Sequence, residues 1–364
     1  MGHGVNSRRE VYLALAERLN RNPLGAPVND VLMEVLFRLY TETEAAVGSR
    51  MPMRPVTLEK AAEVTGIEAG RLDSILDQMA DKGLIMDFSR RGGALYVLAP
   101  MVIGFFEYTF MRAREEVDMK ELAELFESYF KYDQVREEFF GRDTQLFKTL
   151  VYEKLIPAVV ETEVLDYERA SEIIRRSGGG ALSMCSCRHK ARHLGKACGA
   201  PLEVCTTLGS PAQWLVKRGM GRPASVDELL RVLDQTEKEG LVHLGDNVLD
   251  QHIYICHCCG CCCEVLRTTR ETGLLAAHPS NFIPALDPDL CAGCGVCADS
   301  CQVGAIEMRE DTAVIKADLC LGCGACAASC PTDALAMKRR AVLHHPPATK
   351  AEQMSRMMKE KNRA

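Results

Sequence analysis

Eight of the eighteen cysteines fall into two copies of one spacing, in which three cysteines stand three positions apart and a fourth follows four positions later. Three thiolates at such intervals can wrap around one face of a cubane iron–sulfur cluster, while the fourth cysteine of each copy ligates the other cluster. The spacing therefore predicts two [4Fe-4S] clusters, one held by Cys291, Cys294, Cys297 and Cys330 and the other by Cys320, Cys323, Cys326 and Cys301.

Zinc knuckles are the alternative for this stretch, because they also use pairs of cysteines separated by two residues. A zinc ion takes four ligands, so a third cysteine at the same interval has no role in such a site. The repeat therefore favours clusters over zinc.

Residues 283–337 resemble a bacterial two-cluster ferredoxin. Beyond the cysteines, Asp289-Leu290 corresponds to Asp318-Leu319, and Ala305-Ile306 corresponds to Ala334-Leu335. The resemblance implies a small α+β domain that carries low-potential electrons through two [4Fe-4S] clusters. The copies differ at one corner, where Gln302 stands in the place of Pro331. Because proline stiffens a turn, this difference concerns the rigidity of the corner and leaves its ligands unchanged.

Ten further cysteines lie upstream of the repeat, and they are candidate ligands of additional clusters: Cys185, Cys187, Cys198, Cys205, Cys256, Cys258, Cys259, Cys261, Cys262 and Cys263. We expect the first four to form one set. Neighbouring side chains on an extended backbone point in opposite directions, so one cluster cannot easily bind all of the last six. Two to four of these six should be ligands, completing the first set or forming a separate cluster. Soft, dense thiols favour iron–sulfur clusters over zinc or free thiols, but the pairing stays open. The region loosely resembles cysteine-rich segments attached to ferredoxin domains in redox proteins of anaerobes.

A basic segment separates Cys187 from Cys198, and its members are Arg188, His189, Lys190, Arg192, His193 and Lys196. Positive charge of this density would lower the pKa of nearby thiols and stabilise an anionic cluster. An anion-binding surface or a solvated basic loop is the alternative. His257 lies among the later cysteines. We expect it to lie beside a cluster or to be exposed, and not to ligate iron.

The N-terminal region predicts helices over residues 8–40, followed by two helices over 57–66 and 68–82 and a hairpin over 84–98. The order helix, helix, hairpin resembles a winged helix-turn-helix. Binding to DNA would require a basic second helix, but acidic residues outnumber basic ones there: Glu68, Asp73, Asp77 and Asp81 against Arg71 and Lys82. Nucleic acid is therefore an unfavourable partner, and we expect this unit to pack or dock.

The remaining segments predict mostly helices. Residues 105–176 read as a helical scaffold with an extended part starting at Pro157, and a helix over 167–176 should end at Gly178. A strand over 181–184 and an extended stretch over 252–255 lead into the two cysteine groups, with a helix over 225–238 between them. The basic tail should form a helix whose methionines (Met354, Met357 and Met358) dock to a partner, or it is a frayed end.

Composition and segment order predict an α+β multidomain protein: a helical and winged-helix-like domain (1–104), a helical connector (105–180), a cysteine-rich α/β metal-binding module (181–275), the two-cluster domain (283–337) and a basic tail (338–364). The net charge is −6. No apolar stretch has membrane-spanning length, the N-terminus lacks a signal core, and the cysteines stand at ligand spacing, so we expect a reducing, anaerobic cytoplasm.

These features together predict an iron–sulfur electron-transfer protein or subunit that works with a partner oxidoreductase. The sequence has no Ser-His-Asp, paired-carboxylate, flavin or nicotinamide signature and indicates no substrate. Two alternatives stay open: an oxidoreductase with an unusual cluster at Cys256 to Cys263, and a winged-helix regulator that responds to cluster oxidation.

Overall fold

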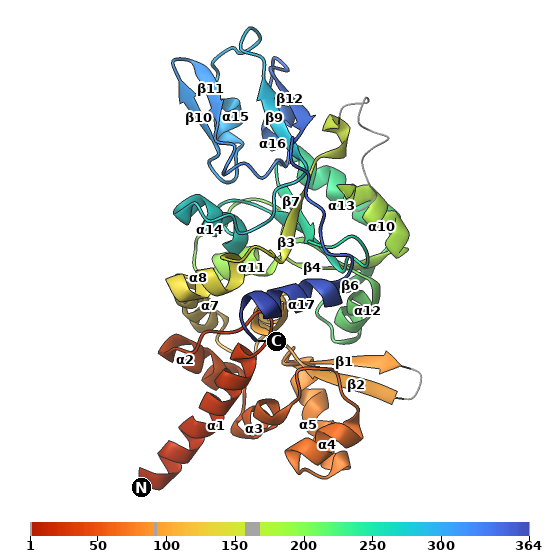
Figure 1. The fold of residues 1–364 in the computed structure, drawn as a ribbon. Helices are drawn as coiled ribbons and strands as arrows, with labels where there is room; N and C mark the ends of the chain where they lie inside the picture. The colour runs from red at the N-terminus through yellow and green to blue at the C-terminus, as the bar shows by residue number, and fades with distance from the viewer. Residues whose placement is uncertain (1, 91–92, 157–167, 364) are drawn as a thin grey trace.

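The computed structural model describes residues 2–90, 93–156 and 168–363, and it begins with a three-helix layer (Figure 1). These helices are α1 (Gly2–Asn20), α2 (Asp30–Leu39) and α3 (Glu42–Arg50). Asn29 caps α2, and Thr41 with Glu44 forms a capping box at α3. Such caps satisfy backbone N–H groups that a helix start leaves without partners. The inner faces are fully buried, so this layer has a continuous core.

The next unit has the helix, helix, hairpin order that the sequence predicts: α4 (Leu58–Thr65), α5 (Ala69–Asp81), β1 (Ile85–Arg90) and β2 (Gly93–Leu98). Gly66 ends α4 in the left-handed conformation that glycine adopts without a steric penalty. Asp87 of β1 accepts hydrogen bonds from Trp214 and Arg218, which lie at α12 (Gly209–Lys217) and directly after it. The hairpin is therefore anchored on the middle of the molecule.

The connector was expected to be helical up to an extended part at Pro157, but the structure also has a strand before that position. Its helices are α6 (Phe106–Phe110), α7 (Met119–Tyr129) and α8 (Asp133–Phe140), whose phenylalanines pack against one another. The segment then contributes strand β3 (Phe147–Leu150), which pairs with β7 (Val242–Asp246). All four residues of β3 are buried, although Lys148 and Thr149 are polar. The segment therefore lacks the alternation of apolar and polar residues that marks a half-buried strand in a sequence. The extended part expected at Pro157 lies outside the described residues.

A six-stranded sheet forms the centre, in the order β3-β7-β8-β5-β4-β6. The remaining strands are β4 (Gly180–Met184), β5 (Glu203–Leu208), β6 (Arg222–Ala224) and β8 (Tyr254–Cys258). All neighbouring strands are antiparallel, so this module is not the α/β unit expected from sequence. Pro223 stands on the edge strand β6, where proline removes no ladder hydrogen bond. Among the described residues, five helices accompany the sheet: α10 (Ala170–Ser177), α11 (Ser186–His193), α12, α13 (Val226–Lys238) and α14 (Glu264–Thr272).

The C-terminal domain lies at one end of the molecule (Figure 1). Two hairpin-like pairs, β9 (Phe282–Leu286) with β12 (Leu335–Arg339) and β10 (Ile306–Arg309) with β11 (Thr312–Ile315), accompany two short helices, α15 (Val296–Asp299) and α16 (Ala325–Ala328). Each short helix carries the third cysteine of one copy of the repeat. Each repeat copy therefore builds the same loop and helix.

The tail does not fray, and its helix α17 (Lys350–Glu360) packs on the chain itself. Gln353 and Met357 are buried, and Lys361 donates to Glu138 at 2.8 Å. Both expectations for the tail, a methionine face for a partner and a solvated end, are therefore wrong. Among the described residues, no helix combines the length and the apolar character that crossing a membrane requires.

Candidate metal centres

The eight cysteines of the repeat surround two small cavities. One is lined by Cys291, Cys294, Cys297 and Cys330, and the other by Cys301, Cys320, Cys323 and Cys326. The fourth cysteine of each copy thus lies with the first three of the other copy. This arrangement is required if the fourth cysteine of each copy ligates the other copy's cluster.

Glycines shape the two cysteine loops. Gly293, Gly295, Gly322 and Gly324 all have positive φ values between 64° and 94°. At Gly293 and Gly322 a side chain would also collide with backbone oxygens of Asp311 and Phe282. The loops can therefore curl tightly around their cavities only with glycine at these positions.

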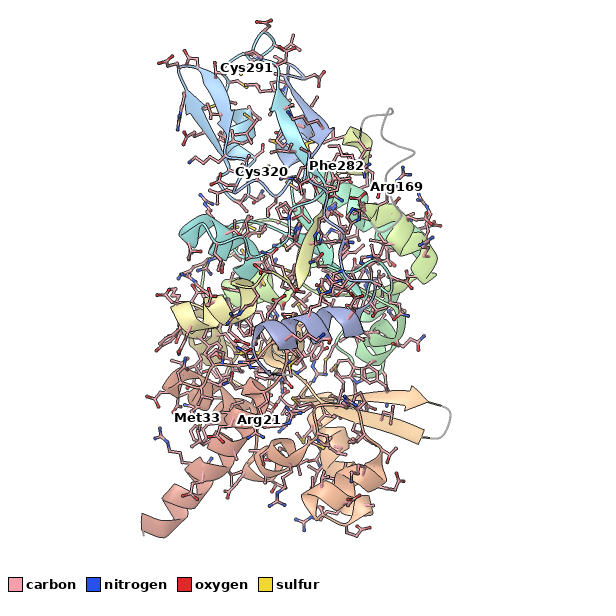
Figure 2. The ribbon with its side chains drawn as sticks, in the orientation of Figure 1. Arg21, Met33, Arg169, Phe282, Cys291 and Cys320 are labelled. Atoms are coloured by element: carbon pink, nitrogen blue, oxygen red, sulfur yellow. The ribbon has the colours of Figure 1, made fainter. Side chains whose placement is uncertain are left out.

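The two cavities differ in their distance from the rest of the protein. Figure 2 shows Cys291 at the far end of the domain and Cys320 toward the central body. Cys294 in the outer set is exposed, whereas Cys320 and Cys326 in the inner set are buried. Arg340 donates to the Cys320 carbonyl oxygen at 2.6 Å, which ties the inner loop down.

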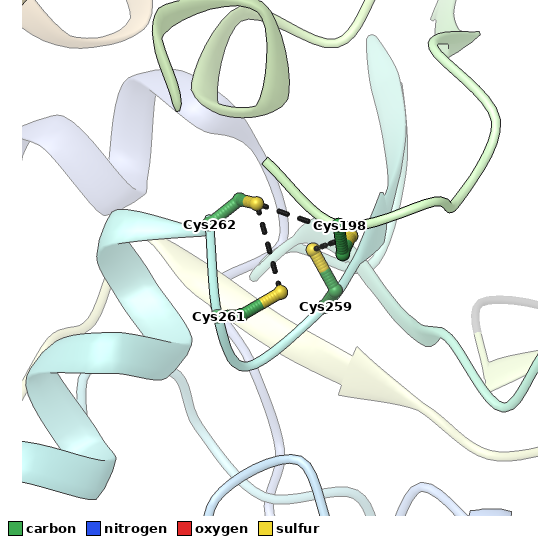
Figure 3. Close-up of side chains that lie close together, drawn as sticks. All are labelled: Cys198, Cys259, Cys261 and Cys262. Atoms are coloured by element: carbon green, nitrogen blue, oxygen red, sulfur yellow. Dashed lines mark hydrogen bonds between the residues drawn. The ribbon is translucent and has the colours of Figure 1, made fainter. Parts of the chain in front are cut away.

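A second group of thiols, the four-thiol site, consists of Cys198, Cys259, Cys261 and Cys262 (Figure 3). Its four sulfur atoms lie within 4.8 Å of one another, with Cys198 and Cys259 3.5 Å apart. An ion that binds four thiolates tetrahedrally at about 2.3 Å holds the sulfur atoms about 3.8 Å apart. The site therefore has the dimensions of a single tetrahedral ion, for which iron and zinc are the suitable metals.

Arg188 lies beside the four-thiol site and has no exposed surface. Its guanidinium donates to the His257 carbonyl oxygen at 3.2 Å and to Cys259 Sγ at 3.5 Å. A hydrogen bond from Cys262 and the charge of Arg188 outweigh burial and lower the pKa of Cys259 to about 4. Cys259 is therefore a thiolate at neutral pH, the form that binds metal.

Lys190, a second cation of the basic segment, is also buried. Lys190 bridges Glu127 of α7 and Glu264 of α14 at 2.5 Å each, and Arg267 donates to both oxygens of Glu127 at 3.0 Å. The anion-binding surface and the solvated loop are therefore wrong for Arg188 and Lys190, because both cations are used inside the chain.

Six cysteines form a third group, the six-thiol set: Cys185, Cys187, Cys205, Cys256, Cys258 and Cys263. All six line one cavity of about 380 Å³, and Cys259 and Cys262 of the four-thiol site also contribute to its wall. Hydrogen bonds from the Cys205 and Cys258 thiols lower the pKa of Cys256 to about 5, and those from Cys187 and Cys258 lower that of Cys263 well below its usual value. The thiols of this group are therefore connected by hydrogen bonds that favour the thiolate forms of Cys256 and Cys263.

The structure does not bring Cys185, Cys187, Cys198 and Cys205 together as one set, as the sequence had suggested. Cys198 joins the four-thiol site, while the other three face the cavity. The dense later group divides in the same way. Cys256 and Cys258, two positions apart on β8, share one face of the sheet, and Cys263 joins them, whereas the loop between supplies the four-thiol site.

His257 is neither exposed nor directed at the thiols. It is 2% exposed, its Nδ1 lies 2.9 Å from the Thr236 hydroxyl, and its Nε2 lies 3.4 Å from the Thr206 hydroxyl. Both ring nitrogens are thus engaged away from metal. Alternation along β8 accounts for this position, since His257 points to the opposite face from its two neighbouring cysteines.

Gln302 makes contacts between the dicluster domain and the central module that the sequence did not reveal. Its side chain accepts a hydrogen bond from Gly260 N at 2.7 Å and donates to the Gly240 carbonyl oxygen at 3.1 Å. Gly260 lies between Cys259 and Cys261, and a side chain there would collide with the Gln302 backbone. The only indication in the sequence was that Gln302 stands where the second repeat copy has Pro331.

Comparison with known proteins identifies one segment: residues 290–334 match the model of the 4Fe-4S dicluster domain. The match covers the repeat and indicates [4Fe-4S] clusters there, and the further cysteines fit additional iron–sulfur centres. No curated protein and no solved structure matches the chain. The match and the cysteine-rich sites together suggest iron–sulfur electron transfer.

Proposed function

We propose that this chain is an electron-transfer protein or subunit that connects a redox partner, through the dicluster domain, to metal centres inside its own central module. When bound, the two [4Fe-4S] clusters supply reversible one-electron chemistry. We assign Cys291, Cys294, Cys297 and Cys330 to one cluster and Cys320, Cys323, Cys326 and Cys301 to the other. The grouping of these cysteines around two cavities supports the assignment.

The observation that carries the proposal is the contact between Gln302 and Gly260. Gln302 follows Cys301 of the inner cluster set, and Gly260 lies within the loop of the four-thiol site. The 2.7 Å hydrogen bond and the close backbone approach hold the two loops against each other. A chain that only stored metal would not need this contact between a dicluster loop and an internal thiol loop.

The outer cluster set offers the surface for a redox partner. Cys294 is exposed, and Leu290 and Val296 beside it are 50% and 37% exposed. Asp287, Asp289 and Asp299 are exposed nearby. Such a surface favours a partner with a basic docking face, because opposite charges steer encounter.

Gln302→Met tests the proposal, because methionine keeps the length of the side chain and removes both hydrogen bonds. We expect the variant to retain the about eight irons of the dicluster domain but to show slower reduction of the internal centre. The measurement is rapid-freeze electron paramagnetic resonance (EPR) after mixing with a limiting amount of reduced methyl viologen. Gln78→Met, at an exposed position of α5, is the matched control. Equal rates in the two variants would contradict the proposed connection.

The regulator alternative is disfavoured by the way α5 is used. Asp77 and Asp81 of this helix pair with Arg218 at 2.8 Å and 2.7 Å, and Arg218 lies directly after α12 of the central module. These two acidic residues would repel the phosphates of DNA, and their ion pairs with Arg218 hold the helix against the central module. We therefore propose a docking role for the helix and hairpin unit.

A further inference from the structure

The cavity lined by the six-thiol set is much larger than a four-cysteine cavity in the same molecule. It measures about 380 Å³, whereas the two cavities of the dicluster domain measure about 20 Å³ each by the same measure. Six cysteines also exceed the four that one cubane cluster binds. The cavity volume and the number of cysteines both indicate that this site has space for a ligand beside a metal centre.

The spacing of the thiols separates this set from the four-thiol site. In the part of the chain that the structure describes, the four-thiol site is the one cysteine group whose ligand atoms all lie within 4.8 Å. A single ion needs thiolates at such close range, while a cluster spans a wider set of ligands. The six-thiol set therefore suits a centre with several metal atoms.

The rest of the cavity wall is predominantly apolar and includes Val97, Leu98, Ile103, Phe106, Leu244 and Ile253. Its charged members have partners within the chain. Glu264 pairs with Lys190, and Lys350 pairs with Asp246. Arg188 is directed to Cys259 and to backbone oxygens. An anionic ligand would therefore meet no cation that is not already paired.

Asn22 Nδ2 and Arg188 Nε of the wall lack a hydrogen-bond partner among the described residues, and two further polar groups there have unused hydrogen-bonding capacity. Tyr254 is 5% exposed, and its hydroxyl has no hydrogen-bond partner among the described residues. Glu107 accepts a hydrogen bond from Gly104 N at 2.8 Å through one oxygen, which leaves its other oxygen for a second contact. Buried hydroxyls almost always have a partner, so the Tyr254 hydroxyl points to a ligand that supplies one.

We propose that the six-thiol set holds a multi-iron sulfur centre and that the cavity beside it binds a small, uncharged, mostly apolar molecule through one oxygen, which accepts a hydrogen bond from the Tyr254 hydroxyl. This inference rests on the proposed electron-transfer function and names the centre that the electrons would reach. The bound molecule lies between the thiols of β8 and the apolar wall, shielded from water.

Metal analysis tests the first half of this proposal. Iron and acid-labile sulfide are measured per chain in anaerobically purified wild-type protein and in the Cys256→Ser/Cys263→Ser and Cys198→Ser/Cys259→Ser double variants. The first variant should lose iron and sulfide but keep the about eight irons of the dicluster domain. The second should keep the sulfide of the six-thiol centre. An unchanged iron content in the first variant overturns the inference, whereas absence of the dicluster irons from wild type would contradict the proposed function instead.

Ligand titration tests the second half, with cyclohexanone as a neutral apolar probe that carries one acceptor oxygen. Cyclohexanone should alter the EPR spectrum of the reduced protein, while cyclohexylammonium and cyclohexanecarboxylate should not. Tyr254→Phe should weaken cyclohexanone binding roughly 3- to 10-fold, as expected for one hydrogen bond. Tyr132→Phe, at an exposed tyrosine, is the matched control.

Three results would overturn the ligand site: no spectral change with cyclohexanone, equal effects of the charged analogues, or equal binding by the two tyrosine variants. The wild-type titration decides by itself if Tyr254→Phe does not fold.

Discussion

Arg188 illustrates how single side chains make a thiol cluster possible. A guanidinium without exposed surface is costly unless anions and acceptors surround it, and this one faces Cys259 and the His257 carbonyl oxygen. The thiolate and the cation stabilise each other, because burial alone would disfavour both charges. Arg188 is therefore a positioning residue for the four-thiol site.

Arg188→Met should lower the free energy of unfolding by about 3 kcal/mol, because it leaves a buried thiolate without its cation. It should also weaken metal retention at the four-thiol site. Urea unfolding and metal content after dialysis against a chelator are the measurements. Arg192→Met, at an exposed position of the same helix, should behave like wild type. Equal stability of the two variants would show that Arg188 has no such role.

Glu127 gives a pH dependence with a defined sign. Burial would raise its pKa, but Arg267 and Lys190 outweigh burial and lower it well below the ordinary 4.5. Burial raises the pKa of Glu264 beside the same lysine, so the pKa values of the two carboxyl groups shift in opposite directions. A lowered pKa contributes stability above the ordinary pKa and loses it as the pH falls toward the folded-state value.

We therefore expect Glu127→Gln to reduce the free energy of unfolding by about 3 kcal/mol at pH 7. The difference from wild type should shrink as the pH falls below about 5. Denaturant unfolding at several pH values provides the measurement, with the exposed Glu124→Gln of the same helix as control. A difference that stays constant down to pH 3 would contradict the assignment.

At the scale of elements, the segment from β8 to α14 distributes six cysteines between two sites. The strand directs Cys256 and Cys258 to the cavity, and Cys263, the residue directly before α14, also lines it. The intervening loop, which contains Gly260, turns the other three toward Cys198. Strand alternation and one loop are therefore sufficient to separate two kinds of centre.

Gly260→Ala tests this element, since the added methyl would collide with the Gln302 backbone. Overpacking of this kind should cost about 1–3 kcal/mol of stability, and it should slow reduction of the internal centre. Gly199→Ala is the control, because a methyl group at Gly199 meets no atom within 4 Å. A Gly260→Ala variant as stable and as rapidly reduced as Gly199→Ala would contradict the close contact.

The sequence predicts those features whose cause is local. The repeat spacing predicted the dicluster domain, and Ser225 and Gly178 marked helix ends that the structure confirms. The partition of the ten upstream cysteines was not predictable, because Cys198 meets Cys259 from 61 positions away in the sequence. Burial of Lys190 depends on two carboxylates distant in sequence, and β3 is a strand because β7 offers it an edge.

At the scale of the whole molecule, the N-terminal helices, the hairpin, the sheet and the tail together enclose the cavity of the six-thiol set. Asn22, Met86, Tyr254 and Met354 line it from these four regions. The hairpin is held by Asp87, which accepts hydrogen bonds from Trp214 at 2.8 Å and from Arg218 at 3.1 Å. The enclosure therefore depends on contacts between regions far apart in sequence.

Asp87→Asn should lower the free energy of unfolding by about 3 kcal/mol, because Arg218 loses its buried partner. It should also loosen the cavity wall and weaken cyclohexanone binding. Denaturant unfolding and the EPR titration measure the two effects, and Asp227→Asn at an exposed position is the control. If Asp87→Asn matched this control in both measurements, the hairpin would not be part of the enclosure.

The most direct test of the central claim is the content of iron, acid-labile sulfide and zinc per chain of anaerobically purified protein, together with EPR of its reduced form. We expect [4Fe-4S] signals and more than the about eight irons and eight sulfides that the dicluster domain alone would hold. The excess iron and sulfide should disappear with Cys256→Ser/Cys263→Ser. Eight irons or fewer, with zinc or free thiols at all ten upstream cysteines, would contradict an internal redox centre.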